Sequence, residues 1–122
     1  EQGSVLAVES SRAAVADGER NLADLPQVRW LAQRVDRALA AEVQRPEVVV
    51  LDPPRKGAGR PIVRAIAAAG ARRVVYVACD PAALARDVAT FADDGFHLAE
   101  LRAFDAFPMT HHVECVALLE RG

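Results

Sequence analysis

Short apolar runs alternate along this chain with longer stretches that are rich in alanine and charged residues. We expect the apolar runs to be β-strands, at residues 5–8, 28–32, 47–51, 74–78, 96–104 and 113–119. The stretches between them have the composition of helices, at about 12–23, 33–43, 61–69 and 81–92. Strands that alternate with helices of this length predict an α/β fold with a mostly parallel sheet and helices on both faces.

Several residues at the segment boundaries support this division. Ser10 or Ser11 can cap the first helix, and Asp80 can cap the last one. Pro61 stands in the first turn of the third helix and Gly70 just past its end, which is the usual asymmetry of helix termini.

Two patterns predict burial. Three consecutive valines within 47–51 are typical of a strand that is covered on both faces. Leu31, Val35 and Leu39 are spaced by four, so we expect them on one face of the second helix.

Composition narrows the class of protein. With 122 residues, 52% hydrophobic and 26% charged, the chain can fill one core. No apolar run approaches the ~18 residues that span a bilayer, and the start lacks the basic flank of a signal peptide. Two cysteines are too few for a disulfide framework, so we expect a reducing, cytoplasmic setting without membrane association. A net charge of -2 argues weakly against a nucleic-acid partner.

Three chemically reactive side chains follow predicted strands directly: Glu9, Asp52 and Cys79. Because the carboxyl ends of parallel strands form one edge of a sheet, these groups could converge there. An acid in the place of Glu9 accepts hydrogen bonds from the ribose hydroxyls of adenosine cofactors, although a solvated loop acid would look the same.

The segment after Asp52 is rigid because Pro53 and Pro54 restrict it. One interpretation is that this segment holds the Asp52 carboxylate at the sheet edge. The alternative is that it is only the turn after the strand, with Asp52 as a solvated acid. A basic cluster beside it suits phosphates, or is a solvated loop; it consists of Arg55, Lys56 and Arg60.

Cys79 stands at the start of a helix, where the helix N-terminus stabilises a thiolate and so favours a nucleophile. A small buried cysteine is the alternative, and the neighbouring Asp80 opposes the thiolate.

The final strand alternates, which places Glu114 on the opposite face from Cys115. We interpret Cys115 as a core residue, whereas an acid in an apolar strand needs a partner or a function. His111 and His112 lack a CxxC or HxxxH pair, so we expect no metal site.

Three segments together resemble one enzyme family. They are Val50-Leu51-Asp52-Pro53-Pro54-Arg55-Lys56-Gly57, Tyr76-Val77-Ala78-Cys79-Asp80-Pro81-Ala82-Ala83-Leu84-Ala85-Arg86-Asp87 and Asp105-Ala106-Phe107-Pro108-Met109-Thr110-His111-His112-Val113-Glu114. In this order they closely resemble the RNA uracil-5-methyltransferases, which make 5-methyluridine in transfer or ribosomal RNA with S-adenosylmethionine. Residues 5–21 also resemble the second strand and helix of that family.

The resemblance implies a Rossmann-like class I methyltransferase fold with S-adenosylmethionine as cofactor and RNA as partner, and no obligate protein partner. It assigns Cys79 as the nucleophile and Glu114 as the general base. It assigns Glu9 and Asp52 to the cofactor site, with Asp52 contacting the cofactor, the uracil or both.

One departure concerns the cysteine motif. Family members usually carry Ser-Cys-Asn-Pro and then a threonine, whereas this chain has Ala78, Asp80 and Ala83 around the retained Cys79 and Pro81. Because the cysteine and the proline are kept, the nucleophile assignment stands. The resemblance also implies a polar residue near the adenine at the end of the third strand, and it is not assigned among Gln33, Arg34 and Asp36.

A second departure is that the family's first strand and glycine-rich loop are missing before residue 5. We therefore expect the chain to be the carboxyl-terminal part of a longer enzyme and to be inactive alone. Two alternatives stay open, an RNA cytosine-5-methyltransferase and a non-catalytic α/β module that binds RNA or protein.

Overall fold

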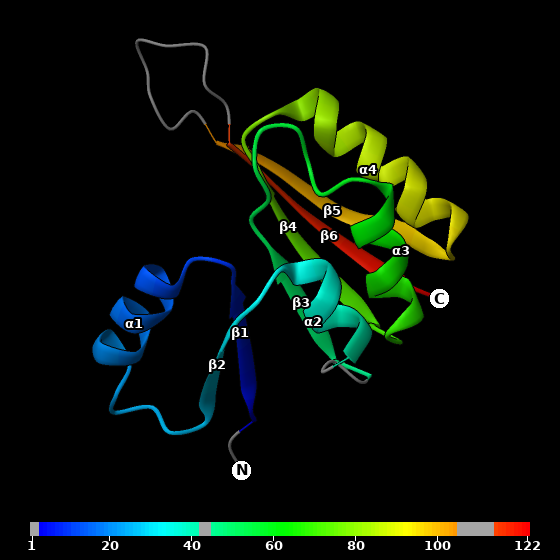
Figure 1. The fold of residues 1–122 in the computed structure, drawn as a ribbon. Helices are drawn as coiled ribbons and strands as arrows, with labels where there is room; N and C mark the ends of the chain where they lie inside the picture. Colours follow the sequence, from blue (N-terminus) through cyan, green and yellow to red (C-terminus); the bar gives the residue numbers. More distant parts are fainter. Residues whose placement is uncertain (1–2, 42–44, 105–113) are drawn as a thin grey trace, which may run out of the picture. The chain divides into compact units, whose positions relative to one another are not determined.

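The computed structural model describes residues 3–41, 45–104 and 114–122. The chain divides into two compact units, Glu1–Val43 and Gln44–Gly122. Each unit is described by itself (Figure 1). None of the helices in the described part is long and apolar enough to cross a membrane.

The first unit contains two strands and two helices in alternation. They are β1 (Val5–Glu9), α1 (Arg12–Asn21), β2 (Val28–Ala32) and α2 (Val35–Ala41). The two strands are parallel and in register from Val5↔Val28 to Glu9↔Ala32. This arrangement confirms the predicted alternation of strand and helix.

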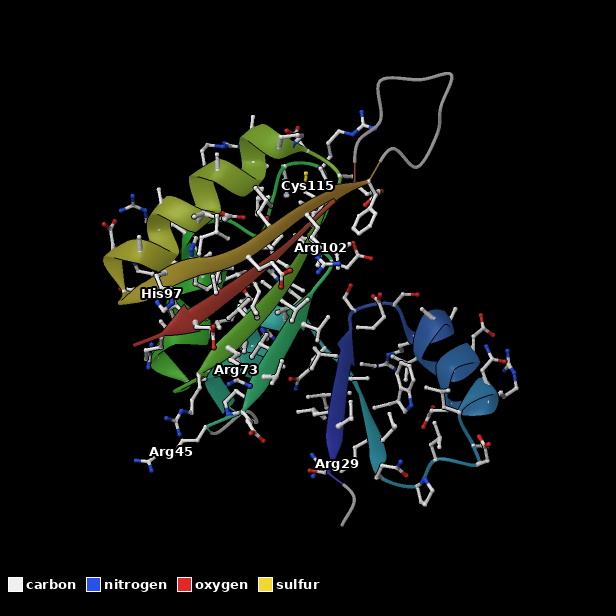
Figure 2. All side chains as sticks on the ribbon, turned by 180° about the vertical axis from the view of Figure 1, so that it is seen from behind. Arg29, Arg45, Arg73, His97, Arg102 and Cys115 are labelled. Carbon is white, nitrogen blue, oxygen red and sulfur yellow. The ribbon has the colours of Figure 1, made fainter. Side chains whose placement is uncertain are left out.

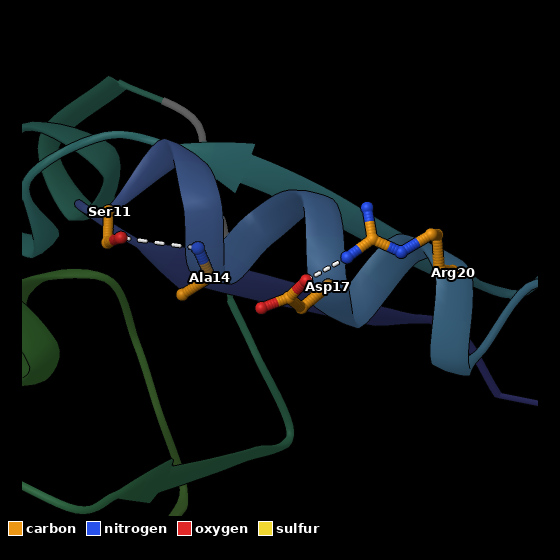
Figure 3. A network of polar contacts seen from close by, with 4 residues as sticks. All are labelled: Ser11, Ala14, Asp17 and Arg20. Carbon is orange, nitrogen blue, oxygen red and sulfur yellow. Dashed lines mark hydrogen bonds and ion pairs between the residues drawn. The ribbon is translucent and has the colours of Figure 1, made fainter.

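Helix α1 begins where the sequence predicts, because Ser11 caps it. The Ser11 Oγ accepts a hydrogen bond from the Ala14 backbone N–H at 3.2 Å (Figure 3). One turn further along, Asp17 and Arg20 form an exposed ion pair, which Figure 3 also shows. An exposed pair adds little stability, so the cap is the stronger of these two signals.

The second unit contains four strands and two helices. They are β3 (Val48–Leu51), α3 (Arg60–Ala68), β4 (Arg73–Ala78), α4 (Pro81–Asp93), β5 (Phe96–Phe104) and β6 (Glu114–Arg121). The strand order is β3-β4-β6-β5. Strands β3 and β4 are parallel, whereas β6 runs antiparallel to both of its neighbours. The sheet is therefore mixed at the β5 side.

Helices α3 and α4 lie next to each other on one face of this sheet (Figure 1). The core lies between them and the strands, and its fully buried side chains include Ile66, Val74, Tyr76, Phe91 and Leu119. Alternate residues of β4 and β6 are buried against the helices, as period-two strands require. Figure 2, seen from behind, shows the strands in front of the helices.

Two expectations about burial were wrong. Val48 and Val50 are 45% and 68% exposed, because β3 is the edge strand of its sheet and both side chains face away from α3 and α4. Leu31 lies in β2 rather than on a helix, since the parallel pairing with β1 continues to Ala32. Of the other two residues predicted to share its face, Val35 is 38% exposed and only Leu39 is buried.

Candidate active site

Asp52 and Cys79 lie at the same edge of the second unit's sheet. Asp52 follows β3 directly and Cys79 follows β4 directly. Because the two strands are parallel, with Leu51 beside Tyr76, their carboxyl ends meet at that edge. The predicted convergence of these two residues is therefore confirmed.

Glu114 lies at the same edge although it begins a strand rather than ending one. The antiparallel ladder pairs Ala78 with Cys115, so Cys79 and Glu114 are the next residues on each side. Cys115 is 7% exposed and faces the helices, as predicted, and alternation turns Glu114 to the other face. Figure 2 shows Cys115 at one end of the sheet and Arg73 at the other end.

The last residues of β3 and β4 lie on the same side of the sheet. Ala78 is buried on the helix side of β4, and Leu51 is on the helix side of β3. Asp52 and Cys79 are the first residues after these two strand ends, next to the strand that Glu114 begins. The register thus brings a thiol and two carboxylates to one corner of the sheet.

The Cys79 thiol stands at the entrance of α4. It is half-buried and free of any disulfide. Asp80 caps the helix, with its Oδ1 accepting from the Ala82 N–H at 2.9 Å and from the Ala83 N–H at 3.3 Å. Because Asp80 is engaged by these donors, its charge is partly satisfied by the helix end rather than directed only at the thiol.

Glu9 belongs to the first unit, where it ends β1 and is half-buried. Its Oε2 accepts from the Ser11 N–H at 2.8 Å, and its backbone carbonyl accepts from the Gln33 N–H at 3.1 Å. These bonds hold the carboxylate at the end of the strand, so the local position predicted for Glu9 is confirmed.

Gln33 follows β2, and its side-chain Oε1 is buried without a hydrogen-bond partner in the described part of the chain. Arg34 and Asp36 pair with each other at 3.1 Å and are exposed. An orphaned buried amide oxygen is costly unless a ligand or water satisfies it. The structure therefore singles out Gln33 from the three polar residues that the sequence left undecided.

One polar residue of the second unit had no predicted role. Asp87 of α4 is 4% exposed and accepts three hydrogen bonds, from the Ala58 N–H, the Gly59 N–H and the Tyr76 hydroxyl. A signal was present, because Asp87 falls on the apolar face of α4 between Leu84 and Phe91. An acid at such a position needs partners, and this pattern could have revealed it.

No group of three metal-ligating side chains lies together among the residues that the structure describes. The predicted loop 105–111, His111, His112 and Val113 lie outside them.

Several solved structures that this chain matches carry the name methyltransferase. The chain matches a Pyrococcus abyssi tRNA (uracil-54, C5)-methyltransferase in complex with S-adenosyl-L-homocysteine with a TM-score of 0.82 and 29% identity, covering 95% of this chain and 28% of that one. A Pyrococcus horikoshii structure that is named a putative RNA methyltransferase matches with a TM-score of 0.75 and 15% identity, covering 97% of this chain and 63% of that one. These matches establish a Rossmann-like methyltransferase fold.

The chain belongs to the tRNA (uracil-5-)-methyltransferase family, whose model matches residues 41–122. Curated relatives carry the name uncharacterized RNA methyltransferase. One from Streptomyces avermitilis is 50% identical over 121 residues, and one from Bifidobacterium longum is 52% identical over 126 residues. They cover 98% and 99% of this chain but only 28% and 29% of their own length. The chain thus spans less than a third of these relatives.

Proposed function

We propose that the full-length protein containing this chain transfers a methyl group from S-adenosylmethionine to carbon 5 of a uridine in tRNA or rRNA. The observation that carries the proposal is the β4–β6 register, which sets Cys79 and Glu114 beside each other at the sheet edge. Membership of the tRNA (uracil-5-)-methyltransferase family supports it.

The two side chains match what the reaction needs. Carbon 5 of uracil is a weak nucleophile, so the Cys79 thiolate first adds to carbon 6 and pushes the electron pair of the double bond toward carbon 5. Bound S-adenosylmethionine supplies an electrophilic sulfonium methyl group. Once carbon 5 carries the methyl group, Glu114 removes its proton, and the electron pair returns to re-form the double bond as the sulfur leaves carbon 6.

Residues of the first unit fit the adenosine part of the cofactor. Glu9 uses Oε2 for Ser11, and its other oxygen takes part in none of the hydrogen bonds recorded among the described residues, so it can accept from ribose hydroxyls. The buried Oε1 of Gln33 can accept from the adenine amino group. We expect Glu9→Gln and Gln33→Ala each to weaken S-adenosylhomocysteine binding about tenfold. The control is Glu19→Gln at an exposed position of α1, which leaves the binding unchanged.

A basic hollow along α4 and the start of α3 suits the RNA backbone. It has a volume of about 410 Å³, and its lining includes the cations Lys56, Arg60 and Arg86 together with the acids Asp87 and Asp93. The side chains of all three cations are exposed, so they can reach phosphates without burying a charge. Three cations against two acids leave the lining positive although the whole chain is mildly acidic, and phosphate attraction depends on the charges along the RNA path.

Covalent trapping tests the proposal. RNA with 5-fluorouridine has no proton at carbon 5 for Glu114 to remove, so an enzyme that adds a cysteine to carbon 6 stays attached after methyl transfer. We expect the full-length protein with S-adenosylmethionine to form a band that survives denaturation, and Cys79→Ala to form none. Cys115→Ala is the matched control and keeps the band. No adduct with the native protein would favour a non-catalytic module, and a preference for 5-fluorocytidine would favour a cytosine enzyme.

We also propose that the 122-residue chain alone is inactive. Its described strands form two separate sheets, β1-β2 and β3-β4-β6-β5. It also spans only 28% of the length of a relative that is 50% identical. Measurable methylation of uridine-containing RNA by the isolated chain would refute this.

A further inference from the structure

The buried carboxylate of Asp87 ties together the two segments that carry Asp52 and Cys79. It accepts from the Ala58 N–H at 2.8 Å, from the Gly59 N–H at 3.2 Å and from the Tyr76 hydroxyl at 2.5 Å. Ala58 and Gly59 belong to the loop that starts at Asp52, and Tyr76 lies on β4 three residues before Cys79. One carboxylate therefore fixes the loop after β3 against the strand that presents the thiol.

The loop is stiff between Asp52 and this anchor. Pro53 and Pro54 restrict the backbone and offer no N–H donors, so this part of the loop cannot be held through their amides. The next turn closes with the Gly57 N–H donating to the Pro54 carbonyl at 2.8 Å. An anchor at Ala58 and Gly59 is thus transmitted through a rigid segment to Asp52.

The loop approaches Asp87 so closely that only glycine fits at position 57. Gly57 has φ +90°, and a Cβ there would lie 2.8 Å from the Asp87 Oδ2. A second contact acts in the same direction, because an Arg86 Nη2 donates to the Lys56 carbonyl at 3.3 Å. Consecutive residues of α4 therefore hold the same loop.

We propose that Asp87 is a positioning residue, which sets the place of Asp52 relative to Cys79 through the backbone of residues 52–59. This inference rests on the proposed function. A packing role alone would not need a carboxylate, because an apolar side chain fills a buried helix position without three donors converging on it. The donors come from the two segments that carry Asp52 and Cys79, which is the arrangement a positioning role requires.

The test compares Asp87→Asn with native protein in the full-length enzyme, at temperatures where melting curves show both to be folded. One amide oxygen cannot replace two carboxylate oxygens, so either Ala58 or Gly59 loses its acceptor. We expect the turnover number at saturating RNA and S-adenosylmethionine to fall at least about tenfold, with KM values changed less than about threefold. Asp24→Asn, an exposed substitution in the first unit, is the control and keeps native turnover.

A double-mutant cycle separates positioning from a general loss of packing. If Asp87 acts through Asp52, then Asp87→Asn causes little further loss in a protein that already carries Asp52→Asn. Gly57→Ala pushes the same loop away from Asp87 while position 87 stays a carboxylate, and we expect it to reproduce the loss. This second variant carries the test if Asp87→Asn does not fold.

Native turnover in folded Asp87→Asn and Gly57→Ala would overturn the inference. Losses from Asp87→Asn and Asp52→Asn that multiply independently would overturn it as well. Methyl transfer that persists in Cys79→Ala would instead overturn the proposed function, whatever the Asp87 variants do.

Discussion

Ala78 of β4 and Cys115 of β6 are direct partners in an antiparallel ladder. The pairing fixes the position of the residues on either side, so Cys79 and Glu114 follow next to each other at this end of the sheet. It also divides the two cysteines, since Cys115 is buried in the core and Cys79 is half-buried at the edge. One hydrogen-bonded register thus places the two residues for which we propose the roles of nucleophile and base.

Replacing Glu114 by glutamine should trap the enzyme on ordinary uridine RNA. Without a base, carbon 5 keeps its proton after methyl transfer, and the sulfur cannot leave carbon 6. We expect turnover to fall roughly 10²- to 10⁴-fold, and a covalent protein–RNA band to accumulate on denaturing gels.

The matched control for that experiment is Glu120→Gln, at the far end of the same strand, where Glu120 pairs with Arg73 at 3.1 Å. It should keep native turnover and form no persistent band. Glu114→Gln with normal turnover would show that another group removes the proton.

The two thiols of the 122-residue chain should react at different rates with a thiol reagent. Cys79 is half-buried at the start of α4, whereas Cys115 is 7% exposed inside β6. We expect labelling of Cys115 to be at least about tenfold slower, because it must wait for local opening of the strand. Mass spectrometry of labelled Cys79→Ala and Cys115→Ala chains shows which thiol reacts fast and which reacts slowly. Equal rates would contradict the structure at this edge.

The strand ends that carry Asp52 and Cys79 were predictable because each of these residues comes after a β-branched run and shortly before a proline. Local pattern could not give the neighbours of a strand, so the insertion of β6 between β4 and β5 was not foreseen. That insertion, and not the motif alone, brings Glu114 to Cys79. The exposure of Val50 was missed for the same reason, since edge and central strands share the same valine-rich composition.

Removing single positive charges from the basic hollow should weaken RNA binding in a salt-dependent way. Each lost phosphate contact lowers the magnitude of the negative slope of log K against log salt by about 0.7 for single-stranded RNA. We expect this for Lys56→Ala and Arg60→Ala in the full-length protein, with unchanged S-adenosylhomocysteine binding. Arg72→Ala, just before β4 and far from its Cys79 end, is the control. An unchanged slope for both hollow variants would place the RNA path elsewhere.

Tyr76 should resist ionisation in the folded chain. Burial raises the pKa of Tyr76 above its ordinary value of about 10, and the hydrogen bond to the Asp87 carboxylate raises it further. The unfolded chain therefore loses the phenol proton first, so this contribution to stability is complete below pH ~10 and declines above it. Tyr76 is the only tyrosine, so absorbance near 295 nm reports it alone.

We expect little phenolate at pH 11 in the folded chain and nearly complete ionisation in denaturant. The free energy of unfolding should fall less steeply above pH 10 in Tyr76→Phe than in the native chain. A folded-state midpoint near 10 would contradict the burial of this hydroxyl.

Gly18→Ala should destabilise the first unit although alanine favours helices. A methyl group at Gly18 would overlap the ring of Trp30, against which α1 packs. The gain in helix propensity is about 1 kcal/mol, whereas forcing extra volume into a packed contact costs about 1–3 kcal/mol. We expect the free energy of unfolding to fall by roughly 1 kcal/mol. The fluorescence of Trp30, the only tryptophan, monitors this unfolding. Ala13→Gly, at an exposed position of the same helix, lowers stability through propensity alone and leaves the emission of folded Trp30 unchanged. A stabilised Gly18→Ala chain with native emission would show that the indole can move aside at no cost.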